Sequence, residues 1–521
     1  MLLGLKKIIS NPRVLSRIQS SSFRISIRFN QQFSNPDSWP ESLPEDRYDI
    51  VINGGGIVGF SMLAAIKSSP FLSSKRVLLI EQQSPPPPSF LKPMDSESQT
   101  KPRKFSNRVF SITQSSKDFF TQLKVWNELI PFAKKVQGMY VWSDYYQNGI
   151  NFHNDAYSID KTMCYILENH RMLQALYRRI NELENPLQKV LYKTSVIDIQ
   201  QTTDASSVMT INLKTIENTE NVEKPNPPRT IQTRLLIGCD GFKSIVRSKS
   251  TLPYFEMDLE QMGIVSTLEI DSSNQTNQMA YQRFVDDKLV IGLLPLDENH
   301  SSLVLSVQKN DLSDWMSLTD EDFVEKLNNV LTREINVRNP LDKLASVLNL
   351  TSVTQGNAQI RYPPTIRSLV SGSRASYPLG FGTTVPFLVG NIQAKTALLQ
   401  TLVNKERRVN TAIIGDAAHR IHPLAGQGLN LGLGDASCLT SCLEHQLSIG
   451  NDIFSPTTTS TELLSQALFE FERSRVLKLV PMLSAIHSMQ TLFKYTPSVI
   501  LPIFNQIDLV KNLIVSFANS R

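Results

Sequence analysis

The chain has 521 residues, of which 41% are hydrophobic, and its net charge of +5 is small for that length. This composition allows a large core divided over two or three domains. Part of the positive charge lies near the start of the chain, so no nucleic-acid-binding face is predicted. Four cysteines, none in a Cys-x-x-Cys pair, exclude a disulfide framework, and the seven histidines show no zinc spacing. We therefore expect no metal site.

Residues 1–40 have the composition of a targeting segment rather than of a folded domain. Basic, serine and apolar residues fill this stretch, and its first acidic residue is Asp37. An acid-poor, basic and serine-rich leader is typical of a mitochondrial transit peptide, and the lack of a long apolar run argues against secretion. We predict import into the mitochondrial matrix, the alternative being a disordered basic arm.

The next segment runs from an apolar stretch directly into three glycines with Gly-x-Gly-x-x-Gly spacing. This pattern predicts a strand, a tight turn and a helix. Gly54 allows the turn, Gly56 lets the backbone approach a pyrophosphate, and Gly59 lets the helix pack close to the strand. A second apolar run ends in Glu81, about 20 positions further on, where a carboxylate would bind ribose hydroxyls. We predict a dinucleotide site here, the alternative being a glycine-rich turn with a surface glutamate.

A proline-rich polar segment, residues 84–104, follows this unit and is predicted to be a loop insertion. Arg108 comes next, before a predicted helix over residues 115–129. It could reach the phosphates or the polyol of a cofactor, although a lone arginine is more often a surface charge. Alternating residues over 137–160 predict strands or a hairpin, and residues 162–183 are predicted to form a helix.

Residues 190–213 are predicted to form a β-hairpin, and residues 216–230 a surface insertion. The strand predicted over 233–237 then leads to Asp240 and Gly241. A carboxylate at the end of a strand, beside a glycine that admits a ligand, suits hydrogen bonding to a cofactor.

Four alternating runs between residues 261 and 308 predict an antiparallel sheet. The runs are Met262–Ile270, Gln278–Val285, Leu289–Leu296 and Ser301–Gln308. A sheet inserted into a nucleotide-binding frame is well placed to cover a substrate. Arg283 lies in the second run and could approach substituents of a bound ring, the alternative being a cation on the surface of the sheet. A helix is predicted near residues 320–335.

A third motif follows a predicted buried strand over residues 409–414 and begins with Gly415 and Asp416. Asp416 can accept hydrogen bonds from polyol hydroxyls. The turn after it would present backbone N–H groups to an electron-rich ring, and its candidate residues are Pro423, Gly426, Gln427 and Gly428. His419 and His422 are candidate acid–base residues, although a histidine beside a tight turn usually satisfies backbone groups.

The last part of the chain is predicted to be helical, first over residues 428–446 and then over 461–521. Prolines and charged residues interrupt the apolar runs of the tail, so no segment is predicted to span a bilayer. The tail could pack on the body of the protein or lie on a membrane surface or a partner. We expect packing together with some such contact.

The three strand-end motifs together predict one extended cofactor, although each alone would be interpreted as a plain turn. A dinucleotide with a long polyol and a fused ring fits them, and FAD has this form. The motifs resemble those of the class A flavoprotein monooxygenases, the aromatic-ring hydroxylases. Within that class, the run His422–Gly432 is similar to the ubiquinone-biosynthesis hydroxylases, as are Tyr281–Phe284, Ile291–Leu296 and Tyr377–Leu379. The resemblance covers about residues 46–490.

The resemblance implies an α/β fold with a Rossmann-like FAD-binding domain, an inserted antiparallel-sheet substrate domain and a helical C-terminal region. The expected boundaries are 1–40 for the transit peptide, 46–255 and 405–450 for the FAD-binding domain, 256–400 for the substrate domain, and 451–521 for the C-terminal region. By position in the motifs, the ADP half of FAD would lie on Gly54, Gly56, Gly59 and Glu81. Arg108 would lie near the ribityl–pyrophosphate region, Asp240 at the pyrophosphate and Asp416 at the ribityl chain, while Pro423, Gly426, Gln427 and Gly428 would line the isoalloxazine.

The activity implied by the resemblance is hydroxylation of a phenolic ring with O2 through a flavin C4a-hydroperoxide. The mitochondrial members act at C5 of a polyprenylated hydroxybenzoate-type intermediate and receive electrons through ferredoxin and its reductase. They imply a peripheral protein on the matrix side of the inner membrane, in contact with other ubiquinone-biosynthesis proteins. Two alternatives stay open: another flavin monooxygenase, epoxidase or polyprenyl reductase of the same fold, and a non-catalytic FAD-binding scaffold.

Overall fold

The computed structural model describes most of the chain between residues 46 and 495. The described ranges are 46–94, 105–143, 146–153, 162–201, 208–216, 228–249, 254–271, 277–285, 289–333, 361–384, 388–390, 409–421, 426–455 and 457–495. The predicted transit peptide, His422, Pro423 and most of the two predicted insertions lie outside these residues.

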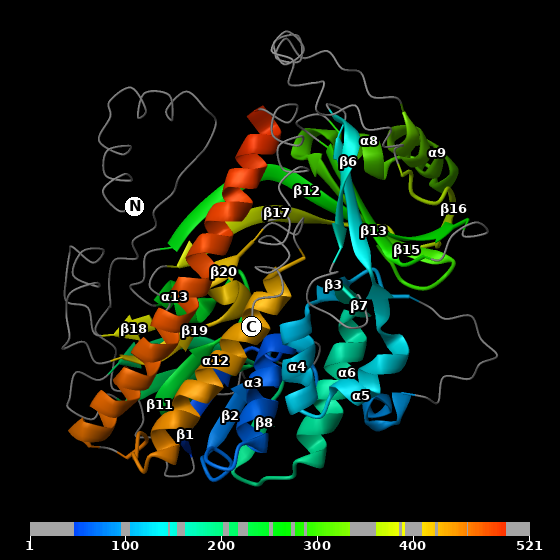
Figure 1. Cartoon of the computed structure of the whole chain (residues 1–521). Helices are drawn as coiled ribbons and strands as arrows, with labels where there is room; N and C mark the ends of the chain where they lie inside the picture. The colour runs from blue at the N-terminus through cyan, green and yellow to red at the C-terminus, as the bar shows by residue number, and fades with distance from the viewer. Residues whose placement is uncertain are drawn as a thin grey trace, which may run out of the picture.

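The first sheet has a parallel core that contains the strands of all three motifs (Figure 1). Its parallel strands, in spatial order, are β19 (Val409–Ile413), β11 (Arg229–Gly238), β1 (Arg47–Asn53), β2 (Val77–Ile80) and β8 (Gln188–Leu191). Three antiparallel strands extend it: β18 (Leu388–Gly390) on β19, β10 (Met209–Thr215) on β11, and β9 (Thr194–Gln201) on β10. The carboxyl ends of β1, β2, β11 and β19 therefore lie along one edge, where a doubly wound fold binds its ligand.

Helices cover the first sheet because its strands are apolar on both faces. Ile50 and Ile52 face one core cluster, whereas Val51 between them faces another. The main helices are α3 (Ile57–Ser68), α6 (Asn169–Glu182), α12 (Gly428–Ser448) and α13 (Thr458–Tyr495). Helix α12 packs against both α3 and α13, as Figure 1 shows. Shorter pieces are η2 (Pro88–Leu91), α7 (Ile245–Lys249) and η6 (Gly415–Ala417).

The second sheet contains the four predicted runs as strands, and they pair antiparallel in the order β12-β15-β14-β13. Its strands are β12 (Tyr254–Ile270), β13 (Met279–Val285), β14 (Leu289–Pro295), β15 (His300–Gln308), β16 (Ile366–Leu369), β17 (Ala375–Thr384), β20 (His419–Arg420), β5 (Gly138–Ser143) and β6 (Tyr146–His153). One face is covered by α8 (Leu312–Met316), reached through η5 (Lys309–Asp311), and by α9 (Asp320–Thr332), which agrees with the helix predicted near 320–335.

Strands β5 and β6 change the expected domain boundaries. The alternating residues over 137–160 form an antiparallel pair as predicted. However, β5 pairs in parallel with β13, so this pair belongs to the second sheet and not to the nucleotide-binding part expected over 46–255. Sequence separation hid this pairing, because parallel neighbours are joined by long crossovers rather than by hairpins.

Two predicted helices differ in the structure, one of them because its first residues belong to a small third sheet. It consists of β3 (Val109–Ile112), β7 (Cys164–Glu168) and β4 (Lys134–Val136). The helix predicted over 162–183 begins only at Asn169, because the short apolar run before it pairs as β7. The helix predicted over 115–129 is divided into α4 (Gln114–Gln122) and α5 (Trp126–Leu129) at Lys124, whose φ of 61° is left-handed, and η4 (Ile130–Phe132) follows.

Among the described residues, no helix is long and apolar enough to cross a membrane.

Candidate cofactor and substrate site

A cavity of about 1280 Å³ extends from the carboxyl edge of the first sheet to the face of the second sheet. Its wall brings together residues of all three sequence motifs. Those among the predicted site residues are Gly54, Gly56, Glu81, Arg108, Asp240, Gly241, Gly415, Asp416, Gly426, Gln427 and Gly428. Gly59 does not line the cavity, and Pro423 lies outside the described residues.

The three glycines of the first motif differ in what a side chain at each position would meet. Gly54 has a φ of 113°, and a Cβ there would lie 2.5 Å from the carbonyl oxygen of Cys239. A Cβ on Gly59 would lie 1.9 Å from the carbonyl oxygen of Gly54, so these two glycines are required by backbone packing. A Cβ on Gly56 would meet no atom within 4 Å, which leaves its backbone open to the cavity. Gly56 is therefore placed to let a phosphate group approach the start of α3.

Glu81 follows β2 and lies beside the glycine turn. Its Oε2 accepts a hydrogen bond of 2.5 Å from the backbone N–H of Gly55, and its Oε1 accepts one of 2.7 Å from Gln83. These bonds fix the carboxylate at the cavity wall, the position that a ribose-binding acid requires.

Asp240 follows β11 and leaves one carboxylate oxygen without a partner. Its Oδ2 accepts hydrogen bonds of 2.9 Å from Asn53 and 2.8 Å from the backbone N–H of Ile245. Its Oδ1 is buried and accepts no hydrogen bond within the described part of the chain. Burial raises the pKa of this carboxyl above its ordinary value, against the opposing effect of its hydrogen bonds. A buried acceptor at a cavity wall needs a donor, and a hydroxyl-bearing cofactor such as FAD supplies one.

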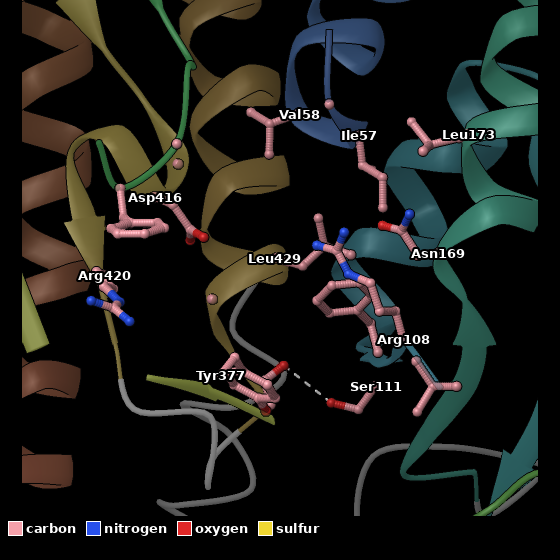
Figure 2. A pocket seen from close by; sticks show the side chains of 18 of the residues that line it. Ile57, Val58, Arg108, Ser111, Asn169, Leu173, Tyr377, Asp416, Arg420 and Leu429 are labelled. Atoms are coloured by element: carbon pink, nitrogen blue, oxygen red, sulfur yellow. Dashed lines mark hydrogen bonds between the residues drawn. The ribbon is translucent and has the colours of Figure 1, made fainter. Parts of the chain in front are cut away.

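Asp416 and Arg108 point toward one another from opposite walls of the cavity (Figure 2). Asp416 stands just after β19, where Gly415 turns the chain with a φ of 62°. Asp416 is exposed to the open cavity, but the protein atoms around it raise the pKa of its carboxyl by desolvation, although His419, Arg420 and Arg108 oppose the shift. A carboxylate and a cation on facing walls suit a ligand that carries both hydroxyl and phosphate groups.

Residues at the start of α12 form a clasp with β3. Gly426 has a φ of 58°, and its carbonyl accepts a hydrogen bond of 3.1 Å from Ser111 Oγ, drawn in Figure 2. Asn430 donates to the carbonyl oxygens of Ser111 at 2.8 Å and Gly426 at 3.1 Å, and it accepts from the N–H of Thr113 at 3.1 Å. The clasp holds the first turn of α12, with its free N–H groups, at the cavity wall. Asn430 stands within the motif that carried the family resemblance, but it was not singled out as a site residue.

His419 is buried and does not line the cavity. Its Nε2 donates a hydrogen bond of 2.6 Å to Asp435 Oδ2. Asp435 also accepts from Arg475 Nε at 2.6 Å and from the backbone N–H of Gly415 at 2.9 Å. This geometry gives His419 a place in a buried ionic cluster behind the cofactor loop, and not the contact with a ring that a catalytic acid or base requires. His422, the second candidate, lies outside the described residues.

Arg283 lies on the face of the second sheet that turns away from the cavity. It is fully buried, donates a hydrogen bond of 3.0 Å to the carbonyl of Arg333, and has its guanidinium 5.9 Å from the centre of the Trp142 ring. Successive residues of a strand point to opposite faces, so its neighbour Gln282 faces the cavity instead. The expected approach of Arg283 to ring substituents is therefore not available in this fold.

The sheet end of the cavity includes residues that were not predicted as site residues, although four of them lie in the runs that carry the family resemblance: Gln282, Gly292, Leu294 and Tyr377. They are mostly apolar, with Tyr377 and a few smaller polar groups among them: Val265, Ala280, Gln282, Gly292, Leu294, Ser302, Val304, Ser376 and Tyr377. Burial raises the pKa of the Tyr377 hydroxyl, while Arg108 lowers it in part. The described residues hold no group of histidine, cysteine and acidic side chains that could bind a metal ion.

Comparison with known proteins agrees with this geometry. The FAD binding domain family matches residues 107–354 and 390–452. The chain is 30% identical over 483 residues to the Ubiquinone biosynthesis monooxygenase COQ6, mitochondrial, of Xenopus tropicalis, which covers 91% of this chain and 93% of the relative. It is also 30% identical over 498 residues to the protein of the same name from Danio rerio, and this match covers 93% of this chain and 92% of the relative. The crystal structure of p-nitrophenol 4-monooxygenase PnpA from Pseudomonas putida DLL-E4 aligns with a TM-score of 0.58 at 15% identity, covering 91% of this chain and 99% of that chain.

The matched domain confirms the predicted FAD cofactor, and the structural likeness confirms the predicted fold class. Together with the named relatives, the matched domain defines an FAD-dependent monooxygenase. The chain belongs to the family of the ubiquinone biosynthesis monooxygenases, as its similarity to the COQ6 proteins over nine-tenths of its length shows. The relatives are named mitochondrial, which agrees with the predicted compartment.

Proposed function

We propose that this chain hydroxylates the aromatic ring, at C5, of a polyprenylated hydroxybenzoate-type intermediate in ubiquinone biosynthesis, with O2 as the second substrate. The observation that carries the proposal is the single cavity that joins the dinucleotide motif to the apolar face of the second sheet. A cofactor and a ring held in one cavity can react without leaving the protein.

In this proposal the bound FAD supplies the activated oxygen, and the chain supplies binding, orientation and exclusion of water. Gly56 and the start of α3 hold the pyrophosphate, and Glu81 holds the adenosine ribose. Asp240 and Asp416 accept hydrogen bonds from the cofactor's hydroxyls, which satisfies the unpartnered Oδ1 of Asp240. Arg108 balances the phosphate charge from the facing wall (Figure 2).

The substrate ring would lie at the sheet end of the cavity. The wall there is formed by β13, β14 and β15 on one side and by residues near β3, β4 and β7 on the other. The cluster of Phe105, Val136, Ile166, Ala280 and Leu296 closes this region with apolar side chains. A dry and mostly apolar wall suits a ring with a prenyl tail and protects a reactive oxygen species from water.

We further propose that the protein is peripheral to the matrix side of the inner membrane, where it contacts other ubiquinone-biosynthesis proteins and receives electrons through ferredoxin and its reductase. The mitochondrial names of the relatives support the compartment, and a prenylated substrate requires access to a membrane. The membrane side and the electron donor rest on the family resemblance described above.

The first experiment is the visible spectrum of the purified chain lacking residues 1–40, with identification of the released cofactor. Flavin bands and released FAD are expected. The reduced enzyme is then given a short-tailed prenyl hydroxybenzoate and O2, and a ring-hydroxylated product is expected. An epoxide or a saturated prenyl chain would indicate the alternative activities of this fold, and no O2 consumption with any reductant would indicate a scaffold.

A further inference from the structure

On strands β13, β14 and β15, Gln282 presents an amide to the cavity beside apolar and small residues. Gln282 lines the cavity and is only 7% exposed, yet among the described residues its amide makes no hydrogen bond. An amide that faces the cavity and has no protein partner among the described residues is available to a ligand that both donates and accepts hydrogen bonds.

The strand register explains why this amide is uncovered. Gln282 pairs with Gly292 on β14, and Gly292 pairs with Val304 on β15, so the three residues form one row on the cavity face. A Cβ on Gly292 would meet only Val304, at 3.5 Å from its carbonyl oxygen, and this is ordinary contact. The fold therefore does not require glycine there. The missing side chain instead leaves open space beside Gln282.

A second polar group lies in the next row of the same face. Ser302 pairs with Leu294, two residues along β14 from Gly292, and lines the same cavity. It is buried, and its Oγ has no hydrogen-bond partner among the residues that the structure describes. Adjacent strands are about 5 Å apart and residues i and i+2 about 7 Å apart, so a planar ring can lie over Gly292 with its substituents toward Gln282 and Ser302.

We propose that Gln282 is the residue that orients the substrate ring, by hydrogen bonding to one of its oxygen substituents over the space left by Gly292. The inference rests on the proposed function, since it assigns the polar contact of that same aromatic substrate. An amide both donates and accepts, so it can pair with a phenolic hydroxyl or with a carboxylate. The prenyl tail then extends along the apolar part of the wall.

The test measures binding to the oxidised holoenzyme, which needs no electron donor. The probe is 4-hydroxybenzoate carrying a two-unit prenyl chain, and binding is followed by the change in the flavin spectrum. Gln282→Leu keeps the size of the side chain and removes the amide. It is expected to weaken binding about three- to tenfold, the usual worth of one neutral hydrogen bond. Gln308→Leu is the matched control, because Gln308 lies on the same face of the sheet at the end of β15, outside the cavity wall.

Two further measurements separate orientation of the ring from a change of shape. Analogues that lack either the hydroxyl or the carboxylate are titrated against wild type and Gln282→Leu, and one of them should bind both proteins equally. The melting temperature of Gln282→Leu without substrate should be unchanged or higher, because the substitution removes no hydrogen bond within the described residues and adds an apolar side chain to the wall. A penalty that persists with both analogues, or wild-type affinity in Gln282→Leu, would overturn the inference. If wild-type holoenzyme binds none of these rings, the proposed function itself fails.

Discussion

The buried cluster around Asp435 should decide whether the turn at Gly415 and Asp416 can form. Asp435 is 2% exposed and accepts three short hydrogen bonds, from His419, Arg475 and the backbone of Gly415. Asp435→Asn keeps the shape but removes the charge that compensates Arg475. Removing one partner of a buried ion pair costs about 3–5 kcal/mol, so a loss of that size in the free energy of unfolding is expected. Asparagine offers one acceptor oxygen instead of two, so its NH2 group must face either Arg475 or the donors of His419 and Gly415, and FAD occupancy should fall with stability.

The assay is urea unfolding of holoenzyme followed by flavin release and tryptophan fluorescence. Burial alone would raise the pKa of Asp435, but His419, Arg475 and its hydrogen bonds hold it below its ordinary value. A lowered folded-state pKa contributes stability above the ordinary pKa of the group, and this contribution is lost as the pH falls through the folded value. The difference between wild type and Asp435→Asn should therefore be full at neutral pH and shrink in acid. Glu444→Gln, more than two turns further along α12, is the control and should behave as wild type. Wild-type stability and flavin content in Asp435→Asn at neutral pH would refute this reasoning.

Three substitutions test separate parts of the first and third motifs, and one chemical modification tests the cysteine pair of α12. Asp416→Ala should weaken FAD binding by about 1.5–3 kcal/mol, which is the usual contribution of hydrogen bonds to a charged acceptor. The melting temperature of the apoprotein should not fall. Stoichiometric yellow flavin in that variant would contradict the placement of Asp416 at the cofactor. Gly56→Ala should fold but retain less FAD, because its Cβ enters the open cavity. Gly59→Ala should fail to fold, because its Cβ would lie 1.9 Å from the carbonyl oxygen of Gly54. Equal solubility of the two variants would count against this distinction. The hydrogen bond from Cys442 lowers the pKa of Cys438 and raises that of Cys442, so iodoacetamide at neutral pH should modify Cys438 first, as peptide mass spectrometry can check.

The parts of the candidate site that the sequence predicted are those fixed by local backbone geometry or by position at the end of a strand. Gly54, Gly59 and Gly415 are glycines because of a left-handed φ or a close backbone approach, and such requirements leave a local pattern that can be read without the fold. The acids Glu81 and Asp240 stand directly after strands, and strand ends meet at one edge of a parallel sheet. For these residues, local spacing was sufficient.

The parts that the sequence did not predict depend on which face of a strand a side chain occupies and on contacts between residues far apart in the sequence. Arg283 and Gln282 are adjacent, and a one-residue shift of register would exchange their faces. Alternation on β13 predicted a strand but not which side would meet the cavity, since both faces of the second sheet are covered. Asp435 and Arg475 lie on different helices, and no spacing rule brings them to Gly415. The short run that forms β7 was equally compatible with a helix until its pairing with β3 and β4 was known.

The C-terminal helix is connected to the cavity wall through this cluster. Helix α13 buries Leu464, Ala467, Leu468 and Phe471 in the main core, so its first half packs on the body as expected. Arg475 then extends that packing to the cavity, because its Nε binds Asp435 and its Nη2 donates to the carbonyl of Leu431 at 3.1 Å. Asp435 in turn holds the N–H of Gly415, the residue before Asp416. The conformation of the loop that faces the cofactor therefore depends on a side chain located 60 residues further along the chain.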